Sequence, residues 1–326
     1  MTSIPDKQGT EYYRQYLSPQ GKTFYDEINT QMKGGSYTGI ISFPIFHPEQ
    51  AGADCFAAYK AIRDDHPEYF FLGRQCEFVQ KGNTGSLTYP VLYSTESIHR
   101  IQIQMRKQVY RLIRGTAYVP EIEKEKIIYE RIAKKLSYTD HSDERDHNIV
   151  GPVLLSNGVC EGHNALLMMC LRRVEIPCIK VYGKTSEGGW HCWAIAWING
   201  QPAHCDVTWD SPTEGIVGFN YMNLSDDQIG IDHFDFKSGH IPVCRSEELT
   251  YHRHFGNYVS SFNDLSRYMK AASGCKKKTL LLHFDYSPLS GNLISEVSKA
   301  IALNPYYSNT RIYSHPVSGN ITIIKD

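Results

Sequence analysis

The feature that most constrains the fold is the dipeptide Asn199-Gly200, which separates two β-rich runs, WHCWAIAWI and QPAHCDVTWD. Asn-Gly between such runs is the strongest short-range signal for a two-residue β-hairpin turn. A turn of this length fixes the register of the two strands, so that Ala194 pairs with Cys205. The sequence therefore predicts an antiparallel sheet with a known register at this point.

The hairpin brings a histidine and an aspartate together. Continuing the register places Trp193 opposite Asp206 and His191 opposite Thr208, and alternation puts these side chains on one face. His191 and Asp206 are then diagonal neighbours, with Cα atoms about 7–8 Å apart. A histidine and an aspartate close such a gap with a hydrogen bond, so we expect a His191–Asp206 pair.

Other polar residues of the hairpin fit this pair less well. Cys192 and Cys205 alternate to the opposite face, so we interpret them as core residues. Asp210 lies roughly 13 Å further along the strand than Asp206 and is therefore the poorer partner for His191. His204 falls on the same face as His191. It could support the pair or be a polar residue at the protein surface, and we favour the surface position.

A cysteine precedes the hairpin at the start of a helix. Gly158 permits a tight turn, and residues 160–174 are rich in leucine and methionine, as in a buried helix. The helix start offers partial positive charge and unpaired N–H groups, which favour a thiolate at Cys160 and can face a developing oxyanion. A cysteine that only packs is the commoner case. Together with His191 and Asp206, however, it supplies the nucleophile, base and orienting acid of thiol-dependent acyl transfer.

Zinc is the alternative interpretation of the same region. Cysteine and histidine are usual zinc ligands, and the region offers Cys160, His163, His191, Cys192 and His204. No C-x-x-C, H-x₃-H or H-E-x-x-H spacing occurs among them, and Cys192 faces away from His191 in the predicted sheet. We therefore expect neither a metal nor another cofactor.

Composition narrows the function classes. The chain has 326 residues, with 34 Lys and Arg against 35 Asp and Glu, so its formal net charge of −1 gives no field for nucleic acid. No apolar run approaches the length of a membrane span, and the first residues have no apolar signal region. Nine cysteines form an odd count without a disulfide framework. We expect reduced thiols and a cytoplasmic protein, although an exported protein without its leader would look the same.

Elsewhere the pattern predicts helices and strands on both sides of the hairpin. Apolar periodicity and capping signals indicate helices at 16–32, 51–65, 94–114, 120–136, 262–272 and 289–303. In the second helix the buried stripe is predicted to contain Phe56, Tyr59 and Ile62. β-type runs indicate strands at 77–80, 85–93, 176–185, 279–286, 311–313 and 321–324.

These elements divide the chain into three regions. We expect an N-terminal α+β region at 1–95, the region with the Cys160 helix and the hairpin at 96–240, and a small C-terminal α/β region at 241–326. The second boundary follows the Gly239–Pro242 break. The fold class is therefore α+β.

Three motifs resemble a known family. Gly-Val-Cys-x-Gly surrounds Cys160, His-x-Trp spans His191 to Trp193, and Asp-Val-Thr-Trp-Asp spans Asp206 to Asp210. Within NGVCEGHNALLMMCLRRVEIPCIKVYG and GGWHCWAIAWINGQPAHCDVTWDSP they look like the core of transglutaminase-like proteins. The resemblance is specific over about residues 120–235, and looser for DHPEYFFLG near the N-terminus. Many members carry a small alanine in place of Cys192.

The resemblance implies a papain-like core, with the cysteine-bearing helix packed on an antiparallel sheet. It makes Cys160 the nucleophile, His191 the base and Asp206 the orienting acid, in agreement with the hairpin geometry. It also implies a protein or peptide substrate, since relatives include transglutaminases, cysteine peptidases and glycopeptide amidases. Of these, hydrolysis of a peptide-like amide is favoured because water is always present.

Several assignments stay open from the sequence. His147 is a candidate for the oxyanion or a substrate contact, although a structural loop histidine is as common. Trp190 and Trp193 flank His191 and could wall a substrate groove; alternation puts Trp193 on the face of His191 and Trp190 in the core or at the rim. Protein cross-linking is the alternative to hydrolysis. A non-catalytic binding module of the same fold is the alternative to an enzyme.

Overall fold

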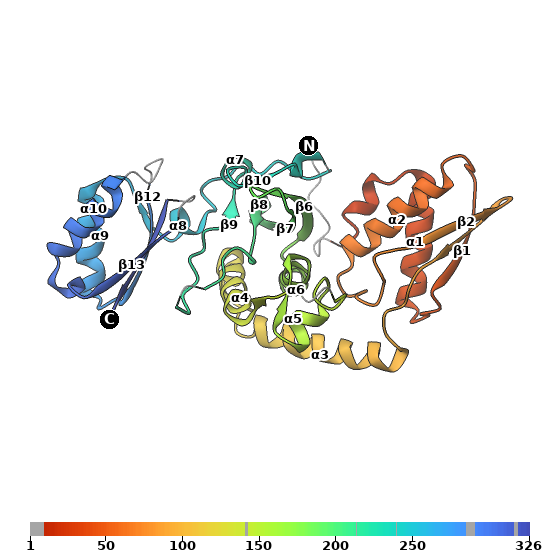
Figure 1. The fold of residues 1–326 in the computed structure, drawn as a ribbon, viewed down its shortest axis with the longest axis horizontal. Coiled ribbons are helices and arrows are strands. Elements are labelled where there is room, and N and C mark those ends of the chain that lie inside the picture. Colours follow the sequence, from red (N-terminus) through yellow and green to blue (C-terminus); the bar gives the residue numbers. More distant parts are fainter. Residues whose placement is uncertain (1–9, 141–142, 213, 239, 285–290, 316–318) are drawn as a thin grey trace.

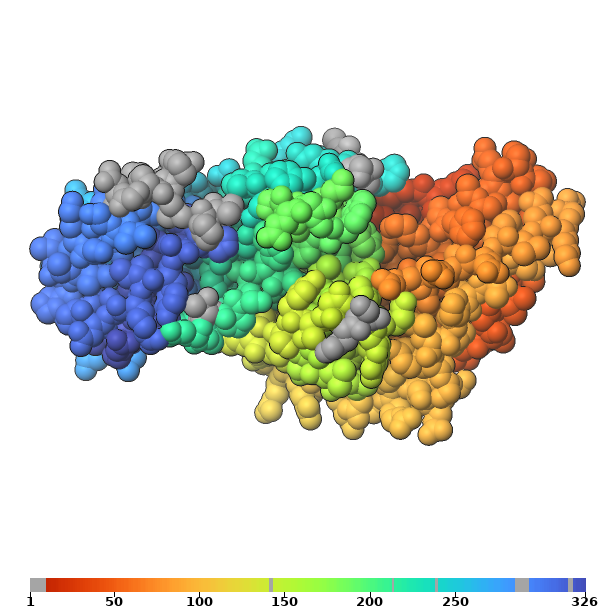
Figure 2. Space-filling model, in the orientation of Figure 1, coloured from red at the N-terminus to blue at the C-terminus, as the bar shows by residue number. Residues whose placement is uncertain are grey.

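The chain forms three parts arranged in a row (Figures 1 and 2). The N-terminal part lies at one end, a middle part carries the predicted hairpin, and the C-terminal part lies at the other end. None of the described helices is long and apolar enough to cross a bilayer. This computed structural model describes residues 10–140, 143–212, 214–238, 240–284, 291–315 and 319–326.

The N-terminal part packs two helices against a three-stranded antiparallel sheet. The Ser18 hydroxyl accepts a hydrogen bond from the Gly21 N–H and caps the first helix, where a proline fits the first turn. Its elements are η1 (Tyr13–Tyr16), α1 (Pro19–Lys33), β1 (Ile40–Pro44), α2 (Ala51–Asp65), β2 (Glu77–Lys81) and β3 (Thr84–Thr88). The strand order is β1-β3-β2.

The middle part begins with helices that enclose one buried helix. These are α3 (Thr95–Ile113), α4 (Glu121–Lys135), α5 (Val150–Leu154) and α6 (Cys160–Arg173). Ser94 caps α3 with its side chain, and Pro120 precedes the first turn of α4. The apolar residues of α6 are buried among α3, α4, α5 and the sheet that follows.

A five-stranded antiparallel sheet completes the middle part, in the order β10-β6-β7-β8-β9. Its strands are β6 (Cys178–Thr185), β7 (Trp190–Ile198), β8 (Gln201–Cys205), β9 (Met222–Leu224) and β10 (His233–Phe234). The predicted hairpin register is confirmed, with Ala194 opposite Cys205. Smaller elements are the parallel pair β4 (Ser137–Tyr138) and β5 (Asn157–Gly158), the helix α7 (Asp226–Ile229) and η2 (Phe236–Ser238).

The C-terminal part is a four-stranded sheet with helices, in the strand order β11-β12-β14-β13. Its elements are α8 (Tyr251–His254), β11 (Tyr258–Val259), α9 (Phe262–Gly274), β12 (Thr279–Phe284), α10 (Gly291–Ala302), η3 (Pro305–Tyr307), β13 (Thr310–Ser314) and β14 (Asn320–Lys325). It touches the middle part through an Asn320–Asn220 side-chain hydrogen bond of 2.7 Å.

The buried apolar residues show how these parts join. One cluster runs from Phe24 to Tyr251 and unites the N-terminal helices with α6, so the N-terminal and middle parts share a core. A separate cluster begins at Val259 and contains the C-terminal part. The three-region division, with boundaries at 95 and 240, remains our proposal, and the clusters favour a second boundary closer to Val259.

Several predicted elements match the structure closely and others do not. The helix at 51–65 has the predicted bounds, but Phe56 is exposed while Tyr59 and Ile62 are buried, because the buried stripe runs instead through Cys55 and Ala58. The run QPAHCDVTWD is a strand only to Cys205, and the residues after it form a turn. The predicted strand at 85–93 ends at Thr88. Residues 285–286 and 289–290 of two predicted elements lie outside the described residues.

Candidate active site

The predicted nucleophile lies at the first position of α6. The residue, Cys160, is only 9% exposed. A glycine two residues later lets a preceding loop close over the helix start, since a Cβ at Gly162 would lie 2.7 Å from the Asp146 carbonyl oxygen. That same carbonyl accepts a hydrogen bond from the Val159 N–H at 3.0 Å. The loop therefore fixes the end of α6 that carries Cys160.

The two faces of β7 have different environments. Ala194 and Ala196 join the apolar cluster that contains α6, whereas Trp193 and Ile195 join a second cluster on the other face. The His191 ring stacks near Trp193, with centroids 5.9 Å apart. Gly183 stands opposite His191 in β6, and any side chain there would collide with the Trp193 ring. The glycine thus makes room for the aromatic support of His191.

Asp206 follows β8 directly and holds His191. The His191 Nε2–H donates to Asp206 Oδ2 at 2.6 Å, as the predicted diagonal required. The backbone N–H groups of Thr208 and Trp209 donate to Asp206 Oδ1 at 2.9 and 3.3 Å. Burial alone would raise the pKa of Asp206, but the charge and hydrogen bond of His191 hold that pKa well below its usual value. Asp206 is therefore an ionised carboxylate.

The other partner of His191 is Cys160. Hydrogen bonds from the Cys192 thiol and the His191 side chain lower the pKa of the Cys160 thiol to about 5, against the opposing effect of burial. Burial would lower the pKa of His191, but Asp206 and Cys160 raise it to about 10. The side chains therefore rest as a thiolate–imidazolium pair at neutral pH.

The contact with Cys192 corrects our expectation that this residue lies apart from the site. Cys192 does occupy the face of β7 opposite His191, yet α6 packs on that same face and brings the Cys160 thiol to it. Burial raises the pKa of Cys192 far above its ordinary value, and the hydrogen bond to Cys160 raises it further. Cys192 thus acts as a neutral S–H donor to the Cys160 thiolate.

A second histidine, absent from our predictions, also binds Asp206. His233 Nε2 lies 3.2 Å from Asp206 Oδ2, and His233 Nδ1 lies 2.5 Å from Asp232 Oδ1. The residue is fully buried in β10, a strand of only two residues. So short a strand gives no periodic signal, and no spacing connects it with the hairpin.

Tyr138 was also missed by sequence reasoning. It lies in β4, within a stretch expected to be a loop, and is 58% exposed. Burial of part of its ring raises the pKa of the Tyr138 phenol, and the nearby Cys160 raises it further. The Tyr138 phenol therefore lies within electrostatic range of the Cys160 thiol.

The remaining candidates are placed as follows. His147 Nδ1 lies 2.9 Å from a carboxylate oxygen of Glu161, the residue after Cys160. Trp190 is 76% exposed, outside the core in which alternation allowed it to lie. Trp193 is buried beneath His191, where it cannot wall an open groove.

His204 and Asp210 support neighbouring parts of the fold. His204 is fully buried, contrary to the favoured surface position: it accepts a hydrogen bond from Trp193 Nε1 at 2.9 Å and lies 3.0 Å from Asp226. Asp210 accepts hydrogen bonds from Tyr129 and from the Tyr221 N–H, at 2.7 and 2.8 Å, and so holds the turn that carries Asp206.

Two groups in the described residues have ligand atoms close enough to test for a metal. One contains His191, Asp206 and His233. Its shortest separation, 2.6 Å, is smaller than the roughly 3.3 Å between two ligand atoms of a tetrahedral zinc ion. This separation is that of a hydrogen bond, and the group could hold a metal ion only if its side chains moved apart.

The second group contains His204, Asp226 and Cys244. His204 Nδ1 accepts from the Trp193 indole, so its proton is on Nε2, the nitrogen that faces Asp226. That nitrogen has no lone pair for a metal. Neither group therefore suits a metal as arranged.

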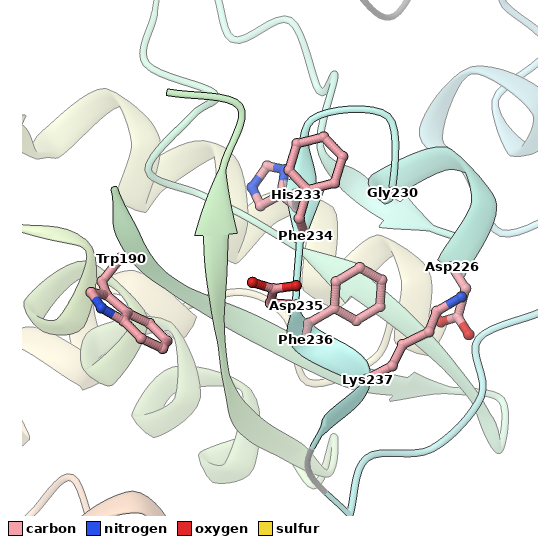
Figure 3. A pocket seen from close by; sticks show the side chains of 8 residues that line it. All are labelled: Trp190, Asp226, Gly230, His233, Phe234, Asp235, Phe236 and Lys237. Atoms are coloured by element: carbon pink, nitrogen blue, oxygen red, sulfur yellow. The ribbon is translucent and has the colours of Figure 1, made fainter. Parts of the chain in front are cut away.

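A pocket of about 640 Å³ lies beside the site (Figure 3). Trp190 stands on one side of it, and the exposed Phe234 stands with Phe236 on the other. His233 connects it to the site through Asp206. Cys160 is not among the described residues that line it, so this pocket borders the thiol site and does not contain the thiol. Its lining is Trp190, Asp226, Gly230, His233, Phe234, Asp235, Phe236 and Lys237.

Comparison with known proteins gives a family for the middle of the chain. Residues 108–207 match the family model of the transglutaminase-like superfamily, which covers Cys160, His191 and Asp206. No curated protein matches the sequence.

Two solved structures are similar over part of the chain. One, described as a TGase, has 13% sequence identity and a TM-score of 0.32, with 52% of this chain and 50% of that chain covered. The other, from Cytophaga hutchinsonii and described as a candidate cysteine protease, has 18% identity and a TM-score of 0.29, with 44% and 64% covered. The chain thus spans half of the first protein and less than two thirds of the second.

Proposed function

Because residues 108–207 carry a core of the transglutaminase-like superfamily, we propose that the protein is a thiol-dependent acyl-transfer enzyme acting on peptide-like amides. The observation that carries the proposal is the continuous contact from Cys160 through His191 to Asp206. Each member supplies what thiol catalysis requires: a lowered thiol pKa, a raised imidazole pKa, and an ionised carboxylate that orients the ring.

The first half of the reaction forms a thioester. The Cys160 thiolate attacks the carbonyl carbon of an amide, and the electron pair of the C=O bond moves onto the oxygen. When the carbonyl re-forms, the C–N bond breaks and His191 gives its proton to the leaving amine. His191 is well placed for this step because Asp206 holds its other nitrogen.

The second half regenerates the thiol. His191, now neutral, takes a proton from water, and the resulting hydroxide attacks the thioester carbonyl. The C–S bond breaks, and the products are a carboxylic acid and the Cys160–His191 ion pair. A primary amine in place of water would give a new amide, which is the cross-linking alternative. We favour hydrolysis.

The negative oxygen of each tetrahedral intermediate needs hydrogen-bond donors. The N–H at the start of α6 is one candidate, since helix starts leave such groups unpaired. Tyr138 is our candidate for the second, because its phenol is within electrostatic range of Cys160 and belongs to an exposed side chain. His147, the candidate from sequence, is held by Glu161 and is the weaker choice.

The pocket beside the site is our candidate for binding the substrate chain. Trp190 directly precedes His191 and presents most of its surface to solvent. Phe234 offers a second exposed ring on the opposite wall (Figure 3). Rings that project from the rim of a site can hold a peptide by apolar contact.

The second candidate function is a binding module that kept the fold without its chemistry. The low pKa of the Cys160 thiol argues against this alternative, since a packing cysteine, such as the buried Cys170, has a raised thiol pKa instead. Thiol reactivity is therefore the property that separates the two functions.

The test is to trap the thioester on the whole protein. Wild type and Cys160→Ala are incubated with a mixture of peptides that carry glutamine, asparagine and ordinary backbone amides, with and without a primary amine. Mass spectrometry then measures the mass added at Cys160, and released ammonia, carboxylic acid or amine conjugate is quantified.

We expect a peptide-derived adduct on Cys160 of the wild type and none on the variant. Acid products without conjugates would identify a hydrolase, and conjugates would identify a cross-linking enzyme. Binding of peptides with identical behaviour of wild type and Cys160→Ala would contradict catalysis and favour the binding module.

A further inference from the structure

His233 binds the same carboxylate oxygen as His191. The two Nε2 atoms lie 3.2 and 2.6 Å from Asp206 Oδ2, and the two rings are 5.4 Å apart between centroids. Together with the N–H groups of Thr208 and Trp209 they give Asp206 four hydrogen-bond donors. A carboxylate has about four lone-pair positions, so His233 completes the set.

The partners of His233 determine its charge. Its second nitrogen, Nδ1, lies 2.5 Å from Asp232 Oδ1, and the other oxygen of Asp232 accepts a hydrogen bond from the Tyr221 hydroxyl at 2.7 Å. Both imidazole nitrogens thus face carboxylate oxygens, which only accept hydrogen bonds when ionised. Both nitrogens must then carry a hydrogen, and an imidazole with two N–H groups is a cation.

The fold holds this ring rigidly. His233 pairs with Thr185 in β6, and Trp193 and Trp209 cover the ring with centroids 4.7 and 4.4 Å away. His233 has no exposed surface although it borders the pocket, so both carboxylates hold it within the interior. Burial would lower the pKa of His233, but the hydrogen bonds with Asp206 and Asp232 raise it overall.

We propose that His233 is a positioning residue of the thiol site: a buried cation, fixed by Asp232, that shares Asp206 with His191. This inference rests on the proposed function and deepens it. His233 acts through Asp206 and touches neither the substrate nor the thiol. It keeps Asp206 ionised and oriented, and its positive charge offsets part of the stabilisation that Asp206 gives to the His191 imidazolium. His191 can then release the proton of its other nitrogen, the one that faces Cys160, to a leaving amine.

Other charged or titratable groups face His233 and enter any pH measurement. They come from the hairpin, from the segment after it and from the C-terminal part, and are His191, His204, Asp206, Tyr221, Asp232 and, through Asp232, His315. Of these groups only Asp206 and Asp232 are hydrogen-bonded to the His233 ring. Substitutions of Asp206, Asp232 and His233 are therefore the ones that test the charge of His233.

The first test uses the pH dependence of Cys160 alkylation by iodoacetamide in the full chain. In His233→Gln the amide can still donate to Asp206 but carries no charge. Removing a cation about 5 Å from His191 raises neighbouring pKa values, so both the thiol and the imidazole midpoints should move upward by about one pH unit. In Asp232→Asn the nitrogen Nδ1 no longer faces a carboxylate, so His233 should lose its second proton and become neutral at pH 7, as followed by nitrogen-15 NMR. His252→Gln, which alters a buried histidine of α8, is the matched control and should move neither midpoint.

The second test reads the charge of His233 directly in the wild type. Nitrogen-15 NMR of labelled histidine at pH 7 should show both nitrogens of His233 protonated, whether or not the variants fold. A neutral His233 would overturn the proposal. So would unchanged midpoints in a His233→Gln protein with native melting behaviour.

The two proposals fail in different ways. If Cys160 of the wild type titrates as an ordinary thiol, near pH 8.5, the proposed enzyme function fails while the NMR result for His233 still stands. If Cys160 is activated and responds to His191→Ala but not to His233→Gln, only the role of His233 is overturned.

Discussion

Two histidines of the same hairpin are each paired with an aspartate, and the two pairs differ in what they can do. His191 is bound to Asp206 at 2.6 Å, and His204 is bound to Asp226 at 3.0 Å. Both histidines are buried. The difference lies in the nitrogen that does not face the aspartate. For His191 that nitrogen is left for the Cys160 thiol, whereas for His204 it accepts the Trp193 indole N–H.

The group that meets this nitrogen, Cys160 or Trp193, gives the two histidines pKa shifts of opposite direction. Asp206 and Cys160 raise the pKa of His191 to about 10, against the effect of burial. Burial lowers the pKa of His204, and its bond to Asp226 only partly offsets that effect. An indole can donate but not accept a proton, so His204 stays neutral. The histidine of a His–Asp pair therefore becomes a proton carrier only where a titratable third group meets its other nitrogen.

The largest expected effect separates the two histidines. His191→Ala should lower the alkylation rate of Cys160 at pH 6.5 by about a hundredfold, because a thiol with a pKa near 8.5 is only about 1% ionised there. His204→Ala should change that rate by less than about threefold. The measurement is iodoacetamide labelling with peptide mapping. Equal losses in both variants would mean that the two pairs do not differ as described.

The aspartates should differ in the same way, with a smaller effect. Asp206→Asn removes the charge that holds the His191 imidazolium, so the Cys160 alkylation rate at pH 6.5 should fall about tenfold. Asp226→Asn should leave that rate unchanged and instead lower the free energy of unfolding by about 1–3 kcal/mol, since it weakens a buried hydrogen bond. Denaturant unfolding measures the second quantity. If Asp226→Asn slowed the alkylation of Cys160 and Asp206→Asn did not, the assignment of Cys160 to the His191–Asp206 pair would be wrong.

Trp193→Phe should make the two histidines more alike. Without the indole donor, Nδ1 of His204 is free to take a proton while Asp226 holds Nε2–H. We expect the pKa of His204 to rise by about one unit, as followed by NMR titration of histidine nitrogens. Trp197→Phe, on the same face of β7, is the matched control. A pKa of His204 that does not move would show that burial alone keeps it neutral.

Cys192→Ala should give the smallest effect. The variant removes the S–H donor to Cys160 and thereby raises the pKa of that thiol, by less than about one unit, since thiols are weak donors. The alkylation midpoint should move upward accordingly. Cys205→Ala, which alters a buried cysteine bound to Glu125, should leave it in place. If the alkylation midpoint of Cys160 fell in Cys192→Ala, Cys192 would not be a hydrogen-bond donor to the thiolate.

Much of the site geometry could be predicted because it depends on local rules. Asn199-Gly200 fixes the hairpin register, and the register alone brings Asp206 to His191. The start of α6 at Cys160 follows from the turn before it. These features need only strand alternation and helix-end chemistry, which act over a few residues.

The rest depends on packing between distant segments. His233 reaches Asp206 because β10 adds to the far side of β6, and two residues carry no periodic signal. Strand alternation placed Cys192 on the correct face but could not show that α6 covers that face. His204 is buried because α7 and the residues after it fold over the hairpin, which no hairpin pattern reveals.

The most direct test of the account is a labelling competition among the cysteines of the wild-type protein. At pH 6.5, limiting iodoacetamide is followed by peptide mapping of all nine thiols. The account predicts that Cys160 is labelled first although it is only 9% exposed, ahead of the exposed Cys275, with a midpoint near pH 5. Labelling of Cys275 before Cys160, at a rate that rises only near pH 8.5, would contradict the claim that His191 and Asp206 activate this thiol.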